Sequence, residues 1–593
     1  MSPIGRTRGR RVLVLGRDTR AFLAVVRSLG RQGLEVQVGW CDPRAAAAQS
    51  RYVRTRHDIP APSLQRFEWR DRLLEILRRE HVDLVIPCND PSILPLQLHK
   101  ADFAPFLGCI YLLEDRAFRI AFDKLESYDL ARSLGIRVPR RLRVACLEDL
   151  PPALDAFSFP VLVKPRASFT SDRLTSKHHV RWARSPRELQ SLVQALLPWG
   201  DVAVEERISG RGAGVEVLAH EGEVLACFQH VRVHEPPSGG GSSYRCSSAL
   251  DPQLVRATQR FLEALRYTGV AMLEFRIDPE RGTWAFIEIN ARFWGSLPLA
   301  LAVGADFPYY LYQMWVEGRR DFPRGYRTGV YCRNLALDAL WMKRTWQADR
   351  SDPTVTTVSR WRVATDLVRL VTLREHSDTF VLDDPWPGVA ELWNAARRGL
   401  RMLQRAVRSR IICRPQLRPR RAATARQALR RARRVLFVCK GNICRSPFAH
   451  HLAERVSPSH LAIASCGYHP EPGRRCPAEA VRVADEMGID LRPHRSQVLS
   501  VRMLHDADVI FVFDQDNYLA LRDGHAWALP KVHFLGVLGD RHPAVIRDPD
   551  GGSAADFRVV YEAIRQSVTS AFSALPRGAD VAPTRPVAPR TPA

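Results

Sequence analysis

A cysteine and an arginine at a short spacing give the strongest chemical signal in this sequence. Cys439 ends the apolar run 435–438, and Arg445 follows it just before Pro447 opens a helical pattern. A loop between a strand and a helix N-terminus turns several backbone N–H groups toward one point and makes an anion site. The planar guanidinium can grip two oxygens of a tetrahedral oxyanion, and a thiolate is favoured in the same field. The spacing therefore predicts a phosphocysteine enzyme with Cys439 as its nucleophile.

The residues around this pair suit a tight loop. Gly441 and Asn442 tolerate the positive φ that such a loop needs. Ser446 follows the arginine and could hydrogen-bond the thiolate. Cys444 could protect the nucleophile from oxidation through a disulfide, or could simply be a small buried side chain, and both interpretations stay open.

The whole run Val-Cys-Lys-Gly-Asn-Ile-Cys-Arg-Ser-Pro, residues 438–447, resembles the signature of the low-molecular-weight protein tyrosine phosphatases. The resemblance implies that Asp548, in Asp548-Pro549, is the general acid that protonates the leaving oxygen. It also implies that Asn442, Ser465 and His494 form the network that braces the loop. Without the resemblance, an Asp-Pro pair would indicate only a turn.

Two positions bear on the substrate, which we expect to be a phosphoprotein or a small phosphomonoester. Ile443 resembles the tyrosine phosphatases, whereas the protein-arginine phosphatases of this fold carry Thr there. The family usually has an aromatic residue after Asp-Pro, but this chain has Asp550, so Tyr468 becomes a candidate to supply a ring. An arsenate-reductase-like domain is an alternative; it needs a resolving cysteine pair well downstream, and none follows Cys476.

A second group of chemically useful residues lies in the front half, on two alternating strand patterns separated by a turn at Gly282. Glu288 and Asn290 are two residues apart and therefore face the same side of their strand, and Glu274 lies on the preceding strand. These hard oxygen ligands suit Mg²⁺, or Mn²⁺, bridging nucleotide phosphates. Arg292 is close enough to contact a phosphate or an acyl phosphate.

From Phe122 onward the sequence resembles the ATP-grasp enzymes, nearest to the carbamoyl-phosphate-synthase-like group, through the order of three further segments: Phe122-Asp-Lys124, Phe159–Pro165 and Val202–Ile208. The resemblance implies ATP binding by Lys124, Lys164, Glu205, Glu206 and Ile208. The loop 166–173 lacks the glycines that often cover the triphosphate, and a Gly-rich run occurs later, at 238–243.

The expected activity of the front half is ATP- and Mg²⁺-dependent ligation of a carboxylate to an amine through an acyl phosphate. The carboxylate and the amine are not identified by the sequence. The alternative is an ATP-binding sensor or scaffold that regulates the phosphatase. Release of ADP that depends on an added carboxylate and nucleophile would distinguish the two.

The elements that position these residues indicate a multidomain α/β protein. At 593 residues the chain is long enough for several domains, and apolar runs such as Arg11–Gly16, Glu35–Gly39 and Val82–Pro87 read as strands. We expect a pre-ATP-grasp α/β domain (1–105), an ATP-grasp domain (106–320), a helical appendage with an Arg-rich linker (321–433), a doubly wound parallel-sheet phosphatase domain (434–575) and a disordered tail (576–593).

Positive charge is concentrated in the linker. The net charge of the chain is +25, and residues 397–434 contain 15 arginines and no acidic residue. Leu400, Leu403, Val407 and Ile411 form one apolar face among these arginines. Such a helix could rest on an anionic membrane surface or could be a solvated connection between domains. Nucleic acid is the weaker partner because no aromatic residues interleave with the arginines.

The remaining composition is that of a soluble, cytoplasmic protein. Hydrophobic residues make up 46% and charged residues 25% of the chain, which is ordinary for a globular protein. The 12 cysteines form no metal-like CxxC pairs, which favours a reducing cytoplasm. No signal peptide is evident, and the longest apolar candidate, Leu297–Val316, contains Asp306 and Pro308 and is expected to be buried rather than membrane-spanning.

Overall fold

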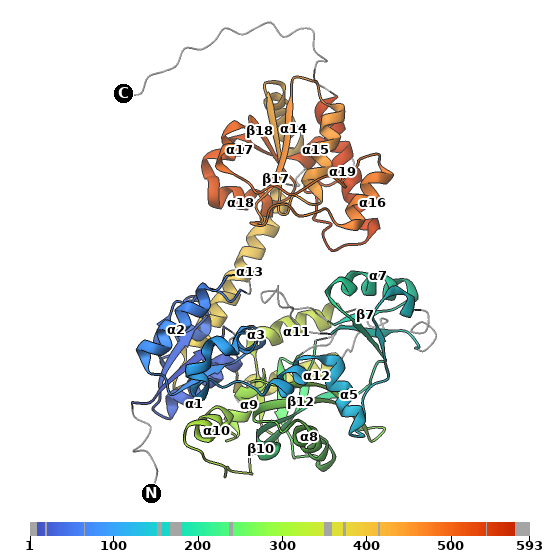
Figure 1. The fold of residues 1–593 in the computed structure, drawn as a ribbon. Coiled ribbons are helices and arrows are strands. Elements are labelled where there is room, and N and C mark those ends of the chain that lie inside the picture. Colours follow the sequence, from blue (N-terminus) through green and yellow to red (C-terminus); the bar gives the residue numbers. More distant parts are fainter. Residues whose placement is uncertain are drawn as a thin grey trace. The chain divides into compact units, whose positions relative to one another are not determined.

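The computed structural model describes residues 9–17, 20–63, 66–150, 157–166, 180–236, 241–348, 358–371, 375–412, 415–540, 542–573 and 575. The predicted tail, nearly all of the loop 166–173 and residues 238–240 of the Gly-rich run lie outside these described residues. The chain divides into two compact units, Met1–Ala396 and Arg397–Ala593. Figure 1 shows the ribbon of both and labels many of their elements.

The first unit begins with a parallel four-stranded sheet in the order β3-β2-β1-β4. Val12, Leu13, Val14 and Leu15 of β1 are completely buried, because helices cover both faces of a parallel sheet. The elements of this sheet are β1 (Arg11–Leu15), α1 (Ala21–Arg31), β2 (Glu35–Gly39), β3 (Val53–His57), α2 (Glu68–Glu80), β4 (Leu84–Pro87) and α3 (Asp90–Leu98).

Two further sheets complete the first unit. A four-stranded antiparallel sheet has the order β5-β8-β6-β7, and a seven-stranded sheet has the order β13-β12-β9-β10-β11-β14-β15. The strands are β5 (Arg141–Val144), β6 (Val161–Pro165), β7 (Arg181–Ala183), β8 (Val202–Glu205), β9 (Arg211–His220), β10 (Glu223–His234), β11 (Tyr244–Ser247), β12 (Gly269–Asp278), β13 (Thr283–Asn290), β14 (Tyr331–Arg333) and β15 (His376–Ser377). The helices are α4 (Asp115–Phe122), α5 (Lys124–Ser133), α7 (Pro186–Leu196), α8 (Pro252–Leu265), α9 (Leu297–Ala302), α10 (Phe307–Val316), α11 (Leu335–Gln347), α12 (Arg360–Val371) and α13 (Trp386–Ile412).

The hairpin predicted around Gly282 is formed by β12 and β13. Gly282 has φ +60° at the turn, a conformation that glycine adopts without strain. The register places Glu274 directly opposite Glu288 and Met272 opposite Asn290. The oxygen-bearing side chains of the two strands are therefore cross-strand neighbours, as the alternating pattern predicted.

The residues after 320 do not form a separate helical appendage at their start, because β14 and β15 extend the seven-stranded sheet. Buried polar contacts hold the following helices to this sheet. His234 on β10 hydrogen-bonds Asp338 (2.8 Å) and Asp366 (3.0 Å) and stacks on Trp341 with ring centroids 3.6 Å apart. The predicted boundary at 320/321 thus falls within the first compact unit rather than at its edge.

The second unit is a doubly wound parallel sheet in the order β17-β16-β18-β19, as predicted. Alternate residues of β16 point to opposite faces: Val435 and Phe437 join the core under α15 and α19, whereas Leu436 and Val438 join the core under α17 and α18. Figure 1 shows these helix pairs flanking the strands. The elements are α14 (Arg418–Arg430), β16 (Arg434–Cys439), α15 (Arg445–Val456), β17 (Ala462–Gly467), α16 (Ala478–Glu486), α17 (Val501–Asp506), β18 (Val509–Val512), α18 (Gln515–His525), β19 (Val532–Phe534) and α19 (Ala554–Phe572).

Helix α14 belongs to the core of this second unit, although its sequence was assigned to the linker. Ala422, Ala425 and Leu429 are buried in the same cluster as the β16 side chains. The Arg418 guanidinium donates hydrogen bonds to the carbonyl oxygens of Gly536 and His542, both at 2.8 Å. The predicted start at residue 434 therefore omits a helix that packs on the sheet domain.

None of the described helices combines the length and the apolar character that spanning a lipid bilayer requires. The predicted helix over Leu297–Val316 is two helices, α9 and α10, and Asp306 caps the second by accepting a hydrogen bond from the backbone N–H of Tyr309. Most of the side chains of both helices are buried.

The packing of α14 generates a stability prediction. Leu429→Ala should lower the free energy of unfolding of the second unit by about 2–5 kcal/mol, because it deletes a side chain that is 1% exposed. Hydrogen exchange of the β16 amides, followed by mass spectrometry on the whole chain, measures the change. Gln427→Ala, at an exposed position of the same helix, is the control and should leave exchange unchanged. Equal protection in Leu429→Ala and wild type would contradict the packing.

Candidate functional site

Cys439 lies at the carboxyl end of β16, and the loop after it leads directly into α15. The residue is 3% exposed. Its Sγ lies 3.2 Å from the backbone nitrogen of Asn442 and 3.0 Å from Ser446 Oγ. No side chain caps the N-terminus of α15 among the described residues, so its first N–H groups remain directed at the loop. This field favours an anionic ligand.

Asn442 holds the loop in shape. Its φ is +51°, a left-handed conformation that asparagine tolerates better than most residues. Its side-chain Nδ2 donates to Ser446 Oγ (2.9 Å) and Ser465 Oγ (3.0 Å), and its backbone carbonyl oxygen accepts from His494 Nε2 (3.0 Å). The three predicted bracing residues are therefore together. Burial lowers the pKa of His494 to about 4, so the ring is neutral and its Nε2 carries the proton.

Arg445 is a buried cation with carboxylates on two sides. Its guanidinium is 1% exposed, lies 2.7 Å from Asp548 through Nη2, and donates through Nη1 to Asp514. The Nε atom is buried and has no hydrogen-bond partner among the described residues. A donor left in this state beside Cys439 suits an incoming oxyanion. Asp514 was missed in the sequence, although its place two residues after the buried strand β18 puts it at the same sheet edge.

Asp548 and Cys439 both line a small cavity of about 130 Å³. Burial raises the pKa of Asp548, Arg445 opposes the rise, and the charges of Asp514 and Asp550 add to it. The carboxyl group can therefore keep a proton for a leaving group. The cavity is lined by Cys439, Lys440, Gly441, Ile443, Cys444, His469, Arg474, Asp548 and Asp550.

Tyr468, the candidate for an aromatic wall, is not among the residues that line this cavity, and His469 lies there instead. Burial raises the pKa of Tyr468 to about 12.

Cys439 and Cys444 are both free thiols, and Cys444 Sγ lies 3.9 Å from Asp550 Oδ1. The sequence did not reveal that Gly467 lies against the loop. A Cβ atom at this position would lie only 2.8 Å from the backbone nitrogen of Asn442. Glycine at this position lets β17 approach the loop.

In the first unit, the side chains of Lys164 and Glu205 form an ion pair. Lys164 Nζ lies 2.6 Å from Glu205 Oε2 and 3.4 Å from the Tyr128 hydroxyl. Burial alone favours the neutral amine, but Glu205 outweighs it, so the pKa of Lys164 is raised and the side chain is a cation. Glu205 Oε1 has no hydrogen-bond partner among the described residues. The carboxylate predicted to contact nucleotide is thus the ion-pair partner of the lysine.

The hairpin residues form a connected chain of polar contacts. Asn290 donates to Glu288 (3.4 Å), and Arg292 donates to Asn290 (2.9 Å) and to Asp90 (2.6 Å) at the start of α3. Asp90 was not predicted; it brings the first sheet to the edge of this site. The arrangement places Arg292 beside both oxygen-bearing strands.

Glu274, the other predicted metal ligand, is paired with a cation. Arg232 Nη2 lies 2.5 Å from its Oε2, and the Glu274 side chain is largely buried. Glu274, Glu288 and Asn290 supply oxygen donors from facing strands, a donor set that suits Mg²⁺ when phosphate and water complete the coordination. Within the described ranges no three His, Cys, Asp or Glu side chains gather closely enough to hold a metal by themselves.

The remaining predicted nucleotide residues are more dispersed. The Glu206 carboxylate accepts the backbone N–H of Arg140 (2.7 Å), and Ile208 is partly buried beyond the end of β8. The backbone N–H of Lys124 donates to the Arg166 carbonyl (3.0 Å), which ties the start of α5 to the end of β6.

The similarities found for the first unit are at low sequence identity. Residues of this chain are 22% identical over 229 residues to the D-aspartate ligase of Enterococcus faecium, covering 35% of this chain and 53% of that protein. The chain thus spans about half the length of that relative. A solved structure, N5-carboxyaminoimidazole synthetase from Staphylococcus aureus complexed with ADP, aligns with a TM-score of 0.46 and 13% identity over 62% of this chain and 97% of that one.

The second unit has a clear family assignment. The model of the low molecular weight phosphotyrosine protein phosphatases matches residues 434–580. The low molecular weight protein-tyrosine-phosphatase Wzb of Salmonella typhi is 31% identical over 142 residues, which cover 24% of this chain and 93% of that protein. Through residues 434–580, this chain belongs to the low molecular weight phosphotyrosine protein phosphatase family.

Proposed function

We propose that the protein is a bifunctional enzyme, with a phosphatase in its second unit and an ATP-dependent carboxylate ligase in its first. The observation that supports the phosphatase is one cavity lined by both Cys439 and Asp548, with the Arg445 guanidinium 2.7 Å from the Asp548 carboxylate. A nucleophile, an oxyanion-binding cation and a proton donor are the groups that phosphomonoester hydrolysis requires.

The reaction proceeds through a phosphocysteine. The Cys439 thiolate, stabilised by Ser446 and by the Asn442 N–H, attacks phosphorus while Arg445 and the loop N–H groups hold the phosphoryl oxygens. The bond from phosphorus to the leaving oxygen breaks, and Asp548 gives that oxygen its proton. Asp548, now a carboxylate, takes a proton from water as the water oxygen attacks phosphorus. The S–P bond then breaks, which releases inorganic phosphate and restores the thiolate.

A phosphotyrosine side chain is the proposed substrate, carried by a protein. Two observations support this substrate. The similar proteins are named protein-tyrosine-phosphatases, and Ile443 lies in the cavity wall. Asp550 lines the cavity where the family usually has an aromatic residue, so no ring at this position stacks on a tyrosine, and a small phosphomonoester is the second candidate. The arsenate-reductase alternative has less support because the sequence has no cysteine after Cys476.

For the first unit we propose ligation of a carboxylate to an amine, with ATP consumed through an acyl phosphate. Glu274, Glu288 and Asn290 would hold Mg²⁺, which supplies positive charge against the nucleotide phosphates. Lys164 would hold phosphate oxygens, and Arg292 would stabilise charge on the acyl phosphate. The similarity to a D-aspartate ligase supports this class of reaction. A sensor that binds ATP and releases no ADP is the alternative.

The first functional prediction concerns the phosphatase residues. Cys439→Ser should abolish hydrolysis of p-nitrophenyl phosphate because a hydroxyl is a far weaker nucleophile than the thiolate. Asp548→Ala should lower kcat about 10²–10⁴-fold, the usual contribution of a positioned proton donor. Since the pKa of Asp548 is raised, wild-type kcat should persist above the ordinary aspartate range and fall as pH rises through that pKa. Asp548→Ala should lose this dependence.

Asp550→Asn is the matched control for that experiment. Removing its charge lowers the pKa of Asp548, so the fall in kcat should move to lower pH while the maximum rate is retained. Undiminished turnover in Cys439→Ser would remove the nucleophile assignment. An unchanged pH profile in Asp548→Ala would assign the proton donor to another group.

The second prediction concerns ATP. Glu288→Gln should weaken ATP binding and make it far less dependent on Mg²⁺, because the amide keeps the shape but loses an anionic ligand. Calorimetric titration of the whole chain with ATP, with and without Mg²⁺, measures both effects. Glu280→Gln, at an exposed position in the same hairpin, should behave like wild type. If wild type binds no ATP in Mg²⁺, the ligase proposal fails.

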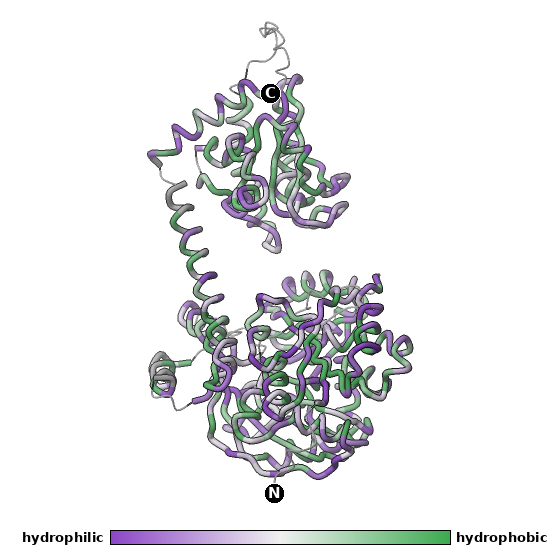
Figure 2. Tube along the Cα trace, turned by 90° about the vertical axis from the view of Figure 1, so that its left-hand side faces the viewer, coloured by the Kyte–Doolittle hydropathy of each residue, from purple (hydrophilic) through white to green (hydrophobic). Residues whose placement is uncertain are grey.

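We also propose that helix α13 contacts an anionic membrane surface without crossing it. Leu400, Leu403 and Val407 are 46–61% exposed on this Arg-rich helix, and hydrophobic and hydrophilic residues alternate along it (Figure 2). An apolar stripe among arginines is typical of interfacial helices.

Vesicle sedimentation tests this third prediction. The chain should pellet with anionic phosphatidylserine vesicles and stay in solution with neutral phosphatidylcholine. Arg397→Gln with Arg398→Gln should weaken the binding by up to about 30-fold, because each basic residue contributes about 1 kcal/mol at such a surface. Added salt should weaken it further. Equal recovery with both lipids would leave α13 as a solvated connection.

A further inference from the structure

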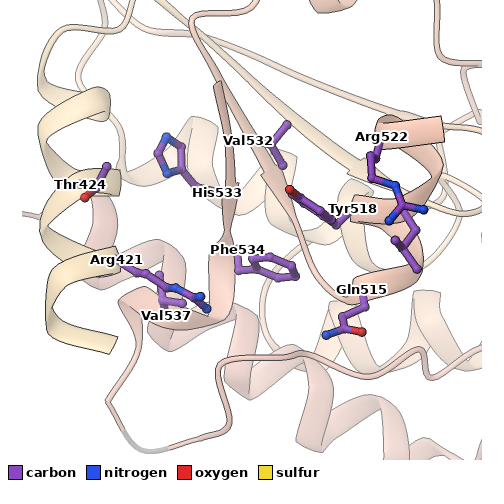
Figure 3. Close-up of a pocket in the computed structure, with 10 residues that line it drawn as sticks. Arg421, Thr424, Gln515, Tyr518, Arg522, Val532, His533, Phe534 and Val537 are labelled. Carbon is purple, nitrogen blue, oxygen red and sulfur yellow. The ribbon is translucent and has the colours of Figure 1, made fainter. Parts of the chain in front are cut away.

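The second unit contains a larger cavity that shares no lining residue with the phosphatase cavity. Its volume is about 500 Å³, within the range of small-molecule sites. Helix α14 forms one side, α18 another, and the edge strand β19 lies between them (Figure 3). The lining residues are Arg421, Thr424, Gln515, Tyr518, Leu519, Arg522, Val532, His533, Phe534 and Val537.

Gln515 is the unusual residue of this cavity. Its side chain is 8% exposed, and both its Oε1 and its Nε2 are buried without a hydrogen-bond partner among the described residues. Burying an amide in this state destabilises a fold, and native structures seldom do so without a reason. The amide offers a donor and an acceptor side by side, which matches a ligand edge that carries an acceptor next to a donor.

The charge of the lining is positive. Arg421 and Arg522 line the cavity, and no aspartate or glutamate does. Arg522 is already paired with Asp523 at 2.7 Å, whereas Arg421 Nη1 is buried without a hydrogen-bond partner in the described structure. Burial lowers the pKa of His533, so this ring adds no charge at neutral pH. Arg421 therefore indicates an anionic group on the ligand.

The rest of the wall is apolar and aromatic. The rings of Tyr518 and Phe534 stack with centroids 5.7 Å apart and planes 25° apart, and Leu519, Val532 and Val537 surround them. Figure 3 shows the Arg421 guanidinium and the Gln515 amide on either side of Phe534. A flat ring fits such a surface, with its edge toward the amide and its charged group toward the arginine.

We propose that this cavity binds a nucleoside phosphate. A nucleobase supplies the flat ring and the adjacent donor and acceptor on its edge, and the phosphate supplies the anion that Arg421 requires. Two of the lining residues, Arg421 and Thr424, come from α14, which precedes the residues matched by the family model. The site is thus a feature of this chain and lies apart from Cys439.

Calorimetric titration with AMP tests the proposal on the whole chain carrying Lys164→Ala and Cys439→Asp, without Mg²⁺. Lys164→Ala and the omission of Mg²⁺ suppress binding in the first unit, and the added carboxylate repels an anion from the loop at residue 439. AMP should bind at one site and adenosine at least tenfold more weakly. Arg421→Ala should make the two ligands bind equally, because only the phosphate contact is lost.

Gln515→Leu separates binding from folding. An apolar side chain of similar size relieves the unpartnered amide, so the thermal midpoint of the ligand-free protein should stay equal or rise, while AMP affinity falls at least tenfold. Arg426→Ala is the matched control: it lies on α14, hydrogen-bonds Ser570, does not line the cavity, and should bind AMP like its parent. Absence of AMP binding in the parent, or equal affinity in Gln515→Leu, would overturn the proposal.

Discussion

Buried positive charge held by carboxylates underlies both proposed active sites. Arg445 lies between Asp514 and Asp548, and Lys164 lies against Glu205, each cation almost without exposure. Taking such charges out of water is costly, and a buried cation is stable only if an anion compensates it. The carboxylates therefore keep the cations charged and in place until an anionic substrate arrives. The sheets, the loop and the helix N-terminus around each cation serve to hold this arrangement.

The Cys439 loop could be predicted in detail because its chemistry is local. The nucleophile, the arginine, the serine and the left-handed asparagine lie within eight consecutive residues, so strand, loop and helix positions follow from one short pattern. The β12–β13 hairpin could be predicted equally well. Side chains alternate between the two faces of a strand, which places Glu288 and Asn290 on the same face. The α/β class with a parallel sheet followed from the same apolar runs.

Contacts between distant segments could not be predicted in this way. Asp514 meets Arg445 only because β18 lies next to β16 in the sheet, and Asp90 meets Arg292 across 202 residues. Glu205 could pair with a ligand or with Lys164, and only the folded geometry decides. The role of α14 was hidden by its composition: arginines dominate its sequence, while the face that packs on the core consists of small residues and one leucine.

The inclusion of α14 in the second core bears on how such a chain could arise. A phosphatase domain joined to another enzyme by recombination at the family boundary would carry no such helix, and the surface beneath it would be open to water. Here the segment before the boundary covers that surface with Ala422, Ala425 and Leu429. Once these contacts had formed, a later deletion at the same junction would expose an apolar face. Selection against that exposure would make the fusion difficult to reverse.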